Sequence, residues 1–182
     1  MLPKAADTPV GRASSGHPGP PVDGARPAAG TRLTAVPRVL LATDADWIHE
    51  EVDAALAGDD IEVLRIREGA DVLPTTYRLE PDLIVLDLQI GNMGGMAACM
   101  DLRLDESVGK LALPPVLMLL DRDVDAFLAH RCEADGWLVK PLDAFRLRRA
   151  ASALLAGETY REGMVGESLE VVAAADEGTT GM

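Results

Sequence analysis

The segment PDLIVLD at residues 81–87 is followed closely by a glycine-rich turn, GNMGG, at residues 91–95. The apolar centre of this segment is unbroken and rich in Ile, Val and Leu, which is typical of a central parallel strand buried on both faces. Asp87 ends the run. It therefore stands at the carboxyl end of a predicted strand, where open α/β sheets build their binding sites.

Two other predicted strands also lead directly into charged residues. The run RVLLAT at residues 38–43 is followed by Asp44, and GWLV at residues 136–139 is followed by Lys140 and Pro141. Carboxyl ends of parallel strands meet at one edge of a sheet, so we expect Asp44, Asp87 and Lys140 to converge. Two acids and a lysine in one place indicate a cation-assisted phosphoryl-transfer site.

Strand and helix signals alternate along the middle of the chain. Predicted strands cover 38–43, 61–66, 81–87, 116–120 and 136–139. Predicted helices cover about 45–57, a short segment that Pro74 shortens or kinks, and about 94–107, 123–133 and 142–156. Five such units in sequence predict an α/β fold with a doubly wound parallel sheet.

The two ends of the chain differ from this middle part. Residues 1–37 hold seven of the 12 prolines and five glycines without periodicity, so we expect them to be disordered. Residues 158–182 are acidic and turn-rich, and we expect a mostly mobile tail there. The predicted organisation is one folded domain, 38–157, between these two segments.

Composition narrows the function. A formal net charge of -13 argues against a nucleic-acid binder, because phosphate contact needs clustered Lys and Arg. The two cysteines, Cys99 and Cys132, lie in predicted helices and suit core positions better than a disulfide scaffold. The sequence opens with no signal-peptide pattern and holds no apolar run long enough to span a bilayer, so we expect a cytoplasmic protein without membrane association.

Four blocks resemble the receiver domains of two-component response regulators. They are Thr43-Asp44, DLIVLDLQIGNMGG at 82–95, PPVLMLLD at 114–121 and ADGWLVKPLD at 134–143. The resemblance covers about residues 37–157 and is specific in the order and spacing of the blocks. It implies a flavodoxin-like five-stranded sheet of order 2-1-3-4-5 and a bacterial signalling module that is not an enzyme.

The resemblance also implies roles for individual residues. Asp87 would be the phosphoacceptor, attacking a phosphoryl donor to give an acyl phosphate. Asp44, Asp87 and the backbone carbonyl of Gln89 would hold Mg²⁺, which favours oxygen ligands. The ammonium of Lys140 would pair with a phosphoryl oxygen, and the bond from Lys140 to Pro141 would be of the often-cis type.

Several positions depart from the family pattern. Thr43 stands where receivers usually carry a second acid, so we expect weaker Mg²⁺ binding. Leu120 replaces the usual Ser or Thr, and a lost hydrogen bond to a charged group costs roughly 1.5–3 kcal/mol. Gly91 replaces a usual proline and loosens the loop after Asp87. Trp137 holds the aromatic switch position, and we expect its indole to keep one rotamer, packed on Leu120.

The resemblance implies protein partners. They would be a sensor histidine kinase or phosphotransfer protein as donor, and an unknown output protein. Arg146, Arg148 and Arg149 form either a solvated face or a docking patch, because receivers commonly dimerise or signal through the face of helix four, strand five and helix five. No helix-turn-helix pattern follows residue 157, so we expect an atypical single-domain receiver with output through protein contacts.

Three alternatives remain open at this level. One is a flavodoxin-like protein that binds flavin or phosphate, although the carboxylates of TDAD at residues 43–46 would repel phosphate. A second is a phosphatase related to the haloacid dehalogenases, which would need an acid where Gln89 stands. The third is a pseudo-receiver that acts without phosphorylation.

Asp121 and Asp123 are predicted to cap the helix that follows them.

Overall fold

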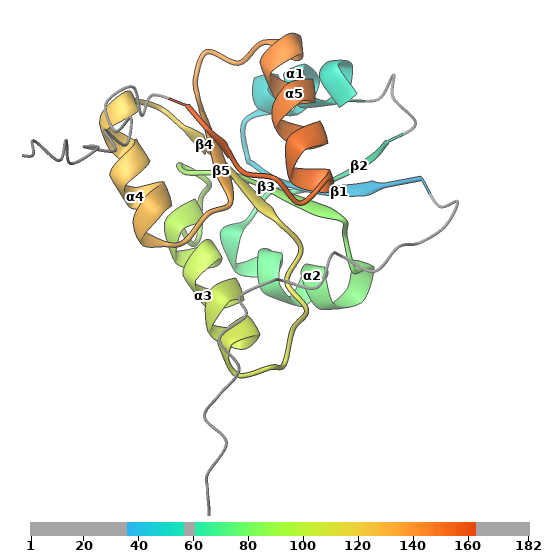
Figure 1. Cartoon of the computed structure of the whole chain (residues 1–182), viewed down its shortest axis with the longest axis vertical. Coiled ribbons are helices and arrows are strands. Elements are labelled where there is room, and N and C mark those ends of the chain that lie inside the picture. Colours follow the sequence, from blue (N-terminus) through green and yellow to red (C-terminus); the bar gives the residue numbers. More distant parts are fainter. Residues whose placement is uncertain (1–35, 57–60, 163–182) are drawn as a thin grey trace, which may run out of the picture.

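The computed structural model describes residues 36–56 and 61–162. The segments predicted to be disordered or mobile, 1–37 and 158–182, lie outside these ranges except for residues 36, 37 and 158–162. The described chain forms one parallel sheet of order β2-β1-β3-β4-β5-β6 (Figure 1). The strands are β1 (Arg38–Ala42), β2 (Glu62–Ile66), β3 (Leu83–Asp87), β4 (Val116–Leu120), β5 (Gly136–Val139) and β6 (Tyr160–Arg161). The predicted doubly wound, flavodoxin-like order 2-1-3-4-5 is confirmed, and a sixth strand extends it.

Helices cover both faces of this sheet. They are α1 (Asp46–Leu56), α2 (Val72–Leu79), α3 (Gly95–Ser107), α4 (Ala126–Arg131) and α5 (Ala144–Leu155). Short 3-10 turns, Gly69–Asp71 and Asp123–Asp125, lead into α2 and α4. One face carries α1 and α5, and the other carries α2, α3 and α4 (Figure 1).

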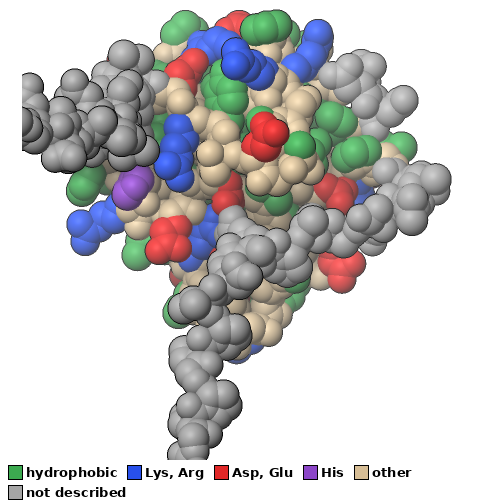
Figure 2. Space-filling model, in the orientation of Figure 1, with side chains coloured by type: hydrophobic (Ala, Val, Ile, Leu, Met, Phe, Trp, Pro, Cys, Tyr) green, Lys and Arg blue, Asp and Glu red, His purple; other side chains and the backbone are tan. Residues whose placement is uncertain are grey.

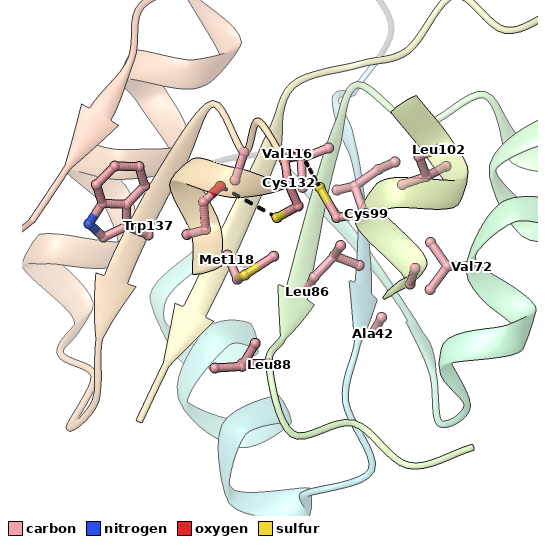
Figure 3. Close-up of a cluster of buried hydrophobic side chains, with 14 of the residues drawn as sticks. Ala42, Val72, Leu86, Leu88, Cys99, Leu102, Val116, Met118, Cys132 and Trp137 are labelled. Atoms are coloured by element: carbon pink, nitrogen blue, oxygen red, sulfur yellow. Dashed lines mark hydrogen bonds between the residues drawn. The ribbon is translucent and has the colours of Figure 1, made fainter. Parts of the chain in front are cut away.

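Alternate residues of the central strands supply two separate cores. Leu86 and its neighbours on one face pack with α2, α3 and α4, and Figure 3 shows part of this cluster. Val85 and its neighbours on the other face pack with α1 and α5. Because β3 and β4 are buried on both faces, every residue in them is buried, and their sequences are almost purely apolar.

Some local predictions need correction. The helix that contains Pro74 is short, as predicted, with eight residues. Pro74 lies in its first turn, where a missing N–H has no intrahelical partner to lose, so the proline does not interrupt the helix. The helix predicted at 123–133 is a 3-10 turn followed by a shorter α4. Within α3, the helix turns Cys99 and Leu102 towards the sheet and leaves Met100 exposed.

The sheet continues beyond residue 157, where the domain was predicted to end. Gly157 ends α5 with φ +81°, and the chain then returns to pair Gly136 with Tyr160 and Trp137 with Arg161. Gly136 permits this approach, since a Cβ there would lie 2.6 Å from the Tyr160 carbonyl oxygen. A two-residue strand is too short to produce a periodic pattern, so β6 was not predicted from the sequence.

Candidate functional site

Asp87 is the last residue of β3, and its carboxylate is buried with only 2% of the residue exposed. Lys140 Nζ lies 2.7 Å from Asp87 Oδ1, and the hydroxyl of Thr43 donates to Asp87 Oδ2 across 2.9 Å. The backbone N–H of Gln89 also donates to Oδ1, at 3.2 Å. A buried carboxylate needs such partners, and here both of its oxygens accept hydrogen bonds.

Lys140 lies between two carboxylates. It follows β5 directly, precedes a cis bond to Pro141, and places Nζ 3.0 Å from Asp121 Oδ1 as well as beside Asp87. The same ammonium lies 5.8 Å from the centre of the Trp47 ring. The convergence of Lys140 and Asp87 that the strand ends indicated is therefore present.

Asp121 is the site residue that the sequence interpretation missed. It was expected to cap α4, but neither the 3-10 turn at 123–125 nor α4 has a side-chain cap, and Asp121 instead pairs with Lys140. The signal was available, because Asp121 directly follows β4 just as Asp44 follows the segment that ends in Thr43.

Asp44 lies at the same edge of the sheet but is exposed in the loop after β1. Its Oδ2 accepts a hydrogen bond from the backbone N–H of Gly91 at 3.2 Å, which ties the loop after β3 to the loop after β1. Both loops thus lie together beside Asp87.

The oxygen atoms at this edge match the ligand preference of Mg²⁺, which is commonly bound by one or two carboxylates and several waters. Asp44 and Asp87 supply the carboxylates, and the Gln89 carbonyl adds a neutral oxygen. Thr43 adds no charge, and its hydroxyl already donates to Asp87. Among the described residues no group of three or more His, Cys, Asp and Glu could hold a metal ion. Any Mg²⁺ at this edge would therefore rely on two carboxylates and the Gln89 carbonyl, with water as its other ligands.

Leu120 and Trp137 are both fully buried in the cluster beneath α3 and α4. Leu120 ends β4, two residues beyond Met118, which is the residue aligned with Trp137 across β4 and β5. The buried Trp137 indole lies at the edge of the cluster drawn in Figure 3, and its Nε1–H donates to the carbonyl oxygen of Glu162 at 2.6 Å. The indole therefore has a hydrogen-bond partner in the segment after α5.

The three arginines of α5 do not form a single basic patch. Arg146 Nε donates to Glu162 Oε1 at 2.7 Å, and Arg148 Nε donates to the Ala55 carbonyl of α1 at 2.7 Å. The Arg149 guanidinium lies 5.9 Å from the centre of the Tyr160 ring. Figure 2 shows basic, acidic and apolar side chains interspersed over the visible face. All three side chains have contacts within the chain. Neither the solvated face nor the docking patch considered from the sequence included such contacts.

Cys99 and Cys132 are free, buried thiols, as their predicted core role requires. The Cys99 thiol donates to the Cys132 carbonyl oxygen at 3.2 Å (Figure 3). Its hydrogen bonding with Cys132 and its burial both raise the pKa of the Cys99 thiol. The pair therefore fills space between α3 and α4.

The fold and this edge together define a class of protein: a doubly wound α/β domain with an acid at the end of its central strand and a lysine paired to it. Residues 39–152 match the family described as the response regulator receiver domain. The chain belongs to this family, and the domain is a receiver of two-component signalling.

Similar proteins include full-length regulators. The DNA-binding response regulator MtrA of Mycolicibacterium smegmatis is 31% identical over 106 residues, covering 57% of this chain and 44% of MtrA. The DNA-binding dual master transcriptional regulator RpaA of Synechocystis is 32% identical over 122 residues, covering 66% of this chain and 49% of RpaA. The chain thus spans about half the length of the curated relatives it matches.

Solved structures agree on the fold. The chemotaxis response regulator CheY4 of Vibrio cholerae superposes with a TM-score of 0.59 at 23% identity, covering 66% of this chain and 99% of CheY4. The receiver domain of the Francisella response regulator 1452 gives a TM-score of 0.59 at 22% identity, with 66% and 98% covered. No described helix, in either of the ranges 36–56 and 61–162, is long and apolar enough to cross a membrane.

Proposed function

We propose that Asp87 is the phosphoacceptor of an atypical receiver whose output passes through protein contacts. The observation that carries this proposal is the 2.7 Å pair between Lys140 Nζ and Asp87 Oδ1 at the end of β3. A carboxylate held next to an ammonium can accept a phosphoryl group while the lysine stabilises the added negative charge. The donor would be a sensor histidine kinase or a phosphotransfer protein in the cytoplasm.

In the reaction, an Asp87 carboxylate oxygen forms a bond to phosphorus as the donor's leaving group departs with its electron pair. Lys140 pairs with a phosphoryl oxygen, and the N–H of Gln89 orients the carboxylate. Mg²⁺, when bound by Asp44, Asp87 and the Gln89 carbonyl, supplies positive charge for the transferred group. With Thr43 neutral, we expect the ion to be held weakly and the reaction to be slow.

The receiver's output surface would be the face formed by α4, β5 and α5, through a partner protein or a homodimer. The net charge of -13 and the internal contacts of Arg146 and Arg148 support protein rather than nucleic acid as the partner of this domain. The relatives MtrA and RpaA are described as DNA-binding regulators. This chain matches about half of the length of each of them.

A specific observation favours a second candidate, a pseudo-receiver that works without phosphorylation. Both oxygens of Asp87 already have hydrogen-bond donors from side chains, Thr43 on one and Lys140 on the other. Lys140 is shared with Asp121, and Leu120 has no hydroxyl to offer a phosphoryl group. A flavin or phosphate binder is less well supported, because carboxylates line the edge where a phosphate would lie.

Intact-mass measurement after incubation with acetyl phosphate and Mg²⁺ tests the proposal. We expect one phosphoryl group to be added slowly or partially, and Asp87→Asn to abolish the addition. Asp123→Asn is the matched control, since Asp123 is an exposed acid beyond the same sheet edge and should label like wild type. No addition at high donor and metal concentrations would favour the pseudo-receiver.

A further inference from the structure

The residues that follow α5, Tyr160, Arg161 and Glu162, form a strap along the free edge of β5 (Figure 1). Backbone pairing joins its first two residues to β5, and the Glu162 side chain extends the pairing by accepting from the Val139 N–H at 2.9 Å. The Arg161 guanidinium lies 5.5 Å from the centre of the Trp137 ring. The strap is therefore joined to β5 by main-chain and side-chain contacts along its length.

Trp137 depends on this strap for its buried position. A buried indole N–H requires a hydrogen-bond acceptor, and the Glu162 carbonyl provides it at 2.6 Å. If the strap left the edge of β5, the indole would keep an unsatisfied donor in an apolar cluster or turn outward. The environment of Trp137 consequently reports whether the strap is docked.

Arg146 connects the strap to the backbone around Lys140. Its guanidinium forms an ion pair with Glu162, and Nη2 and Nη1 also donate to the carbonyls of Val139 and Pro141, each at 2.9 Å. Val139 and Pro141 are the two neighbours of Lys140 in sequence. One side chain, held in place by Glu162, thus binds the carbonyl of the residue before the lysine and the carbonyl of the residue after it.

From these contacts we infer that Arg146 and Glu162 are positioning residues, which couple docking of the strap on β5 to the placement of Lys140 beside Asp87. The inference rests on the proposed function, because it concerns the lysine of that site. Lys140 has short contacts to Asp87 and Asp121 that depend on where residues 139–141 lie. Holding those residues on both sides keeps the ammonium in the reactive position, which is how pre-organisation acts.

Coupling of this kind is reciprocal. If a docked strap favours the contact of Lys140 with a phosphoryl group, a bound phosphoryl group stabilises the docked strap by the same factor. Because the strap is already docked, this reinforcement would not change the environment of Trp137. It would instead slow hydrogen exchange at the Val139 amide, whose acceptor is Glu162.

The experiment uses the full chain with Trp47→Phe, so that Trp137 is the single tryptophan. Glu162→Gln removes the ion pair with Arg146. Arg146→Gln removes that ion pair and the hydrogen bonds to the carbonyls of Val139 and Pro141. Glu158→Gln is the matched control, since Glu158 is an exposed acid four residues before Glu162. Circular dichroism checks that each variant is folded. We expect Glu162→Gln and Arg146→Gln to red-shift Trp137 emission and to slow labelling by acetyl phosphate at least about fivefold.

Lys140→Met tests the same coupling without phosphorylation. Loss of both Lys140 ion pairs should loosen residues 139–141, speed exchange at the Val139 amide and red-shift Trp137 emission. If wild type is never labelled but Lys140→Met gives these shifts, the coupling stands and the proposed phosphorylation fails. If Lys140→Met leaves both signals unchanged, or Glu162→Gln undocks the strap without slowing the labelling of a reactive protein, the inference is overturned.

Discussion

Thr43 donates its hydroxyl to Asp87, with 2.9 Å between Thr43 Oγ1 and Asp87 Oδ2, and both side chains are buried. Receivers usually carry an acid at the position of Thr43. Here a neutral donor satisfies one oxygen of Asp87 and leaves the metal site with the carboxylates of Asp44 and Asp87. The substitution therefore removes a negative charge from the site and gives the Asp87 oxygen that faces Thr43 a neutral hydrogen-bond donor.

Restoring the acid with Thr43→Asp should tighten Mg²⁺ binding about tenfold, equivalent to ~1.4 kcal/mol, because it adds a negative charge beside a divalent ion. Without metal, the same variant should melt at a lower temperature, since two buried carboxylates would repel each other. Trp47 fluorescence can follow the titration, as that ring lies beside Lys140. Thr43→Ser keeps the hydroxyl and is the control. Equal Mg²⁺ affinity in Thr43→Asp and wild type would show that the acid is not what limits binding.

Restoring a hydroxyl at the end of β4 with Leu120→Thr should make Trp137 emission respond to a small phosphoryl mimic. A ligand shifts an equilibrium only by its differential affinity for the two states, and Leu120 offers the phosphoryl group no hydrogen bond. Leu120→Val has nearly the shape of threonine without the hydroxyl, so it should not respond. A large response in the unaltered protein would mean that the domain switches without this hydroxyl.

Asp121→Asn should speed labelling of Asp87 by acetyl phosphate, by up to about fivefold. Asp121 shares Lys140 with Asp87 at 3.0 Å, and removing its charge leaves the ammonium available to the incoming phosphoryl group. Asp121 is 36% exposed, so its ion pair is worth only ~1 kcal/mol or less. Initial rates from intact mass measure the effect, with Asp123→Asn as control. Slower labelling would indicate that Asp121 assists the site.

Arg103→Met should lower the free energy of unfolding by about 3 kcal/mol, because it strips a largely buried carboxylate of its cation. Arg103 Nη2 lies 2.8 Å from Asp135 Oδ2, with side chains only 10% and 11% exposed, and the same oxygen accepts from the Val116 N–H. Lys110→Met is the comparison: its ammonium is 67% exposed and 3.7 Å from Asp105, so the loss should stay below ~1 kcal/mol. Urea unfolding followed by tryptophan fluorescence distinguishes the two. Similar losses would contradict this ranking.

Cys99 should resist alkylation by iodoacetamide at pH 8.5 in the folded protein. The thiolate is the reactive form, and a pKa raised by hydrogen bonding with Cys132 and by burial keeps the Cys99 thiol protonated as pH rises. In urea the same thiol should be modified readily. Mass spectrometry of the peptide that contains Cys99 gives the rate of alkylation. Rapid modification of the native protein would rule out a buried Cys99 thiol with a raised pKa.

The sequence alone was sufficient for the main features of the fold and for the position of Asp87. Residues 83–86 form an unbroken apolar run, which indicates a strand buried on both faces. The residue that ends such a strand lies at the edge of the sheet where binding sites form. The position of Lys140 at the same edge was predicted by the same rule. The last helix was predicted to end at about residue 156, and α5 ends at Leu155, two residues before Gly157, whose left-handed φ favours glycine.

Tertiary structure alone decided the polar partners of the remaining charged side chains. Arg148 binds the Ala55 carbonyl, 93 residues away, and Arg146 takes Glu162 rather than an external partner. Asp121 pairs with Lys140 and does not cap the helix that follows it. Periodicity and propensity describe neighbours along the chain, whereas these pairs depend on how strands and helices align in space. That alignment follows from packing the two cores, so long-range polar contacts such as the strap on β5 leave no local pattern in the sequence.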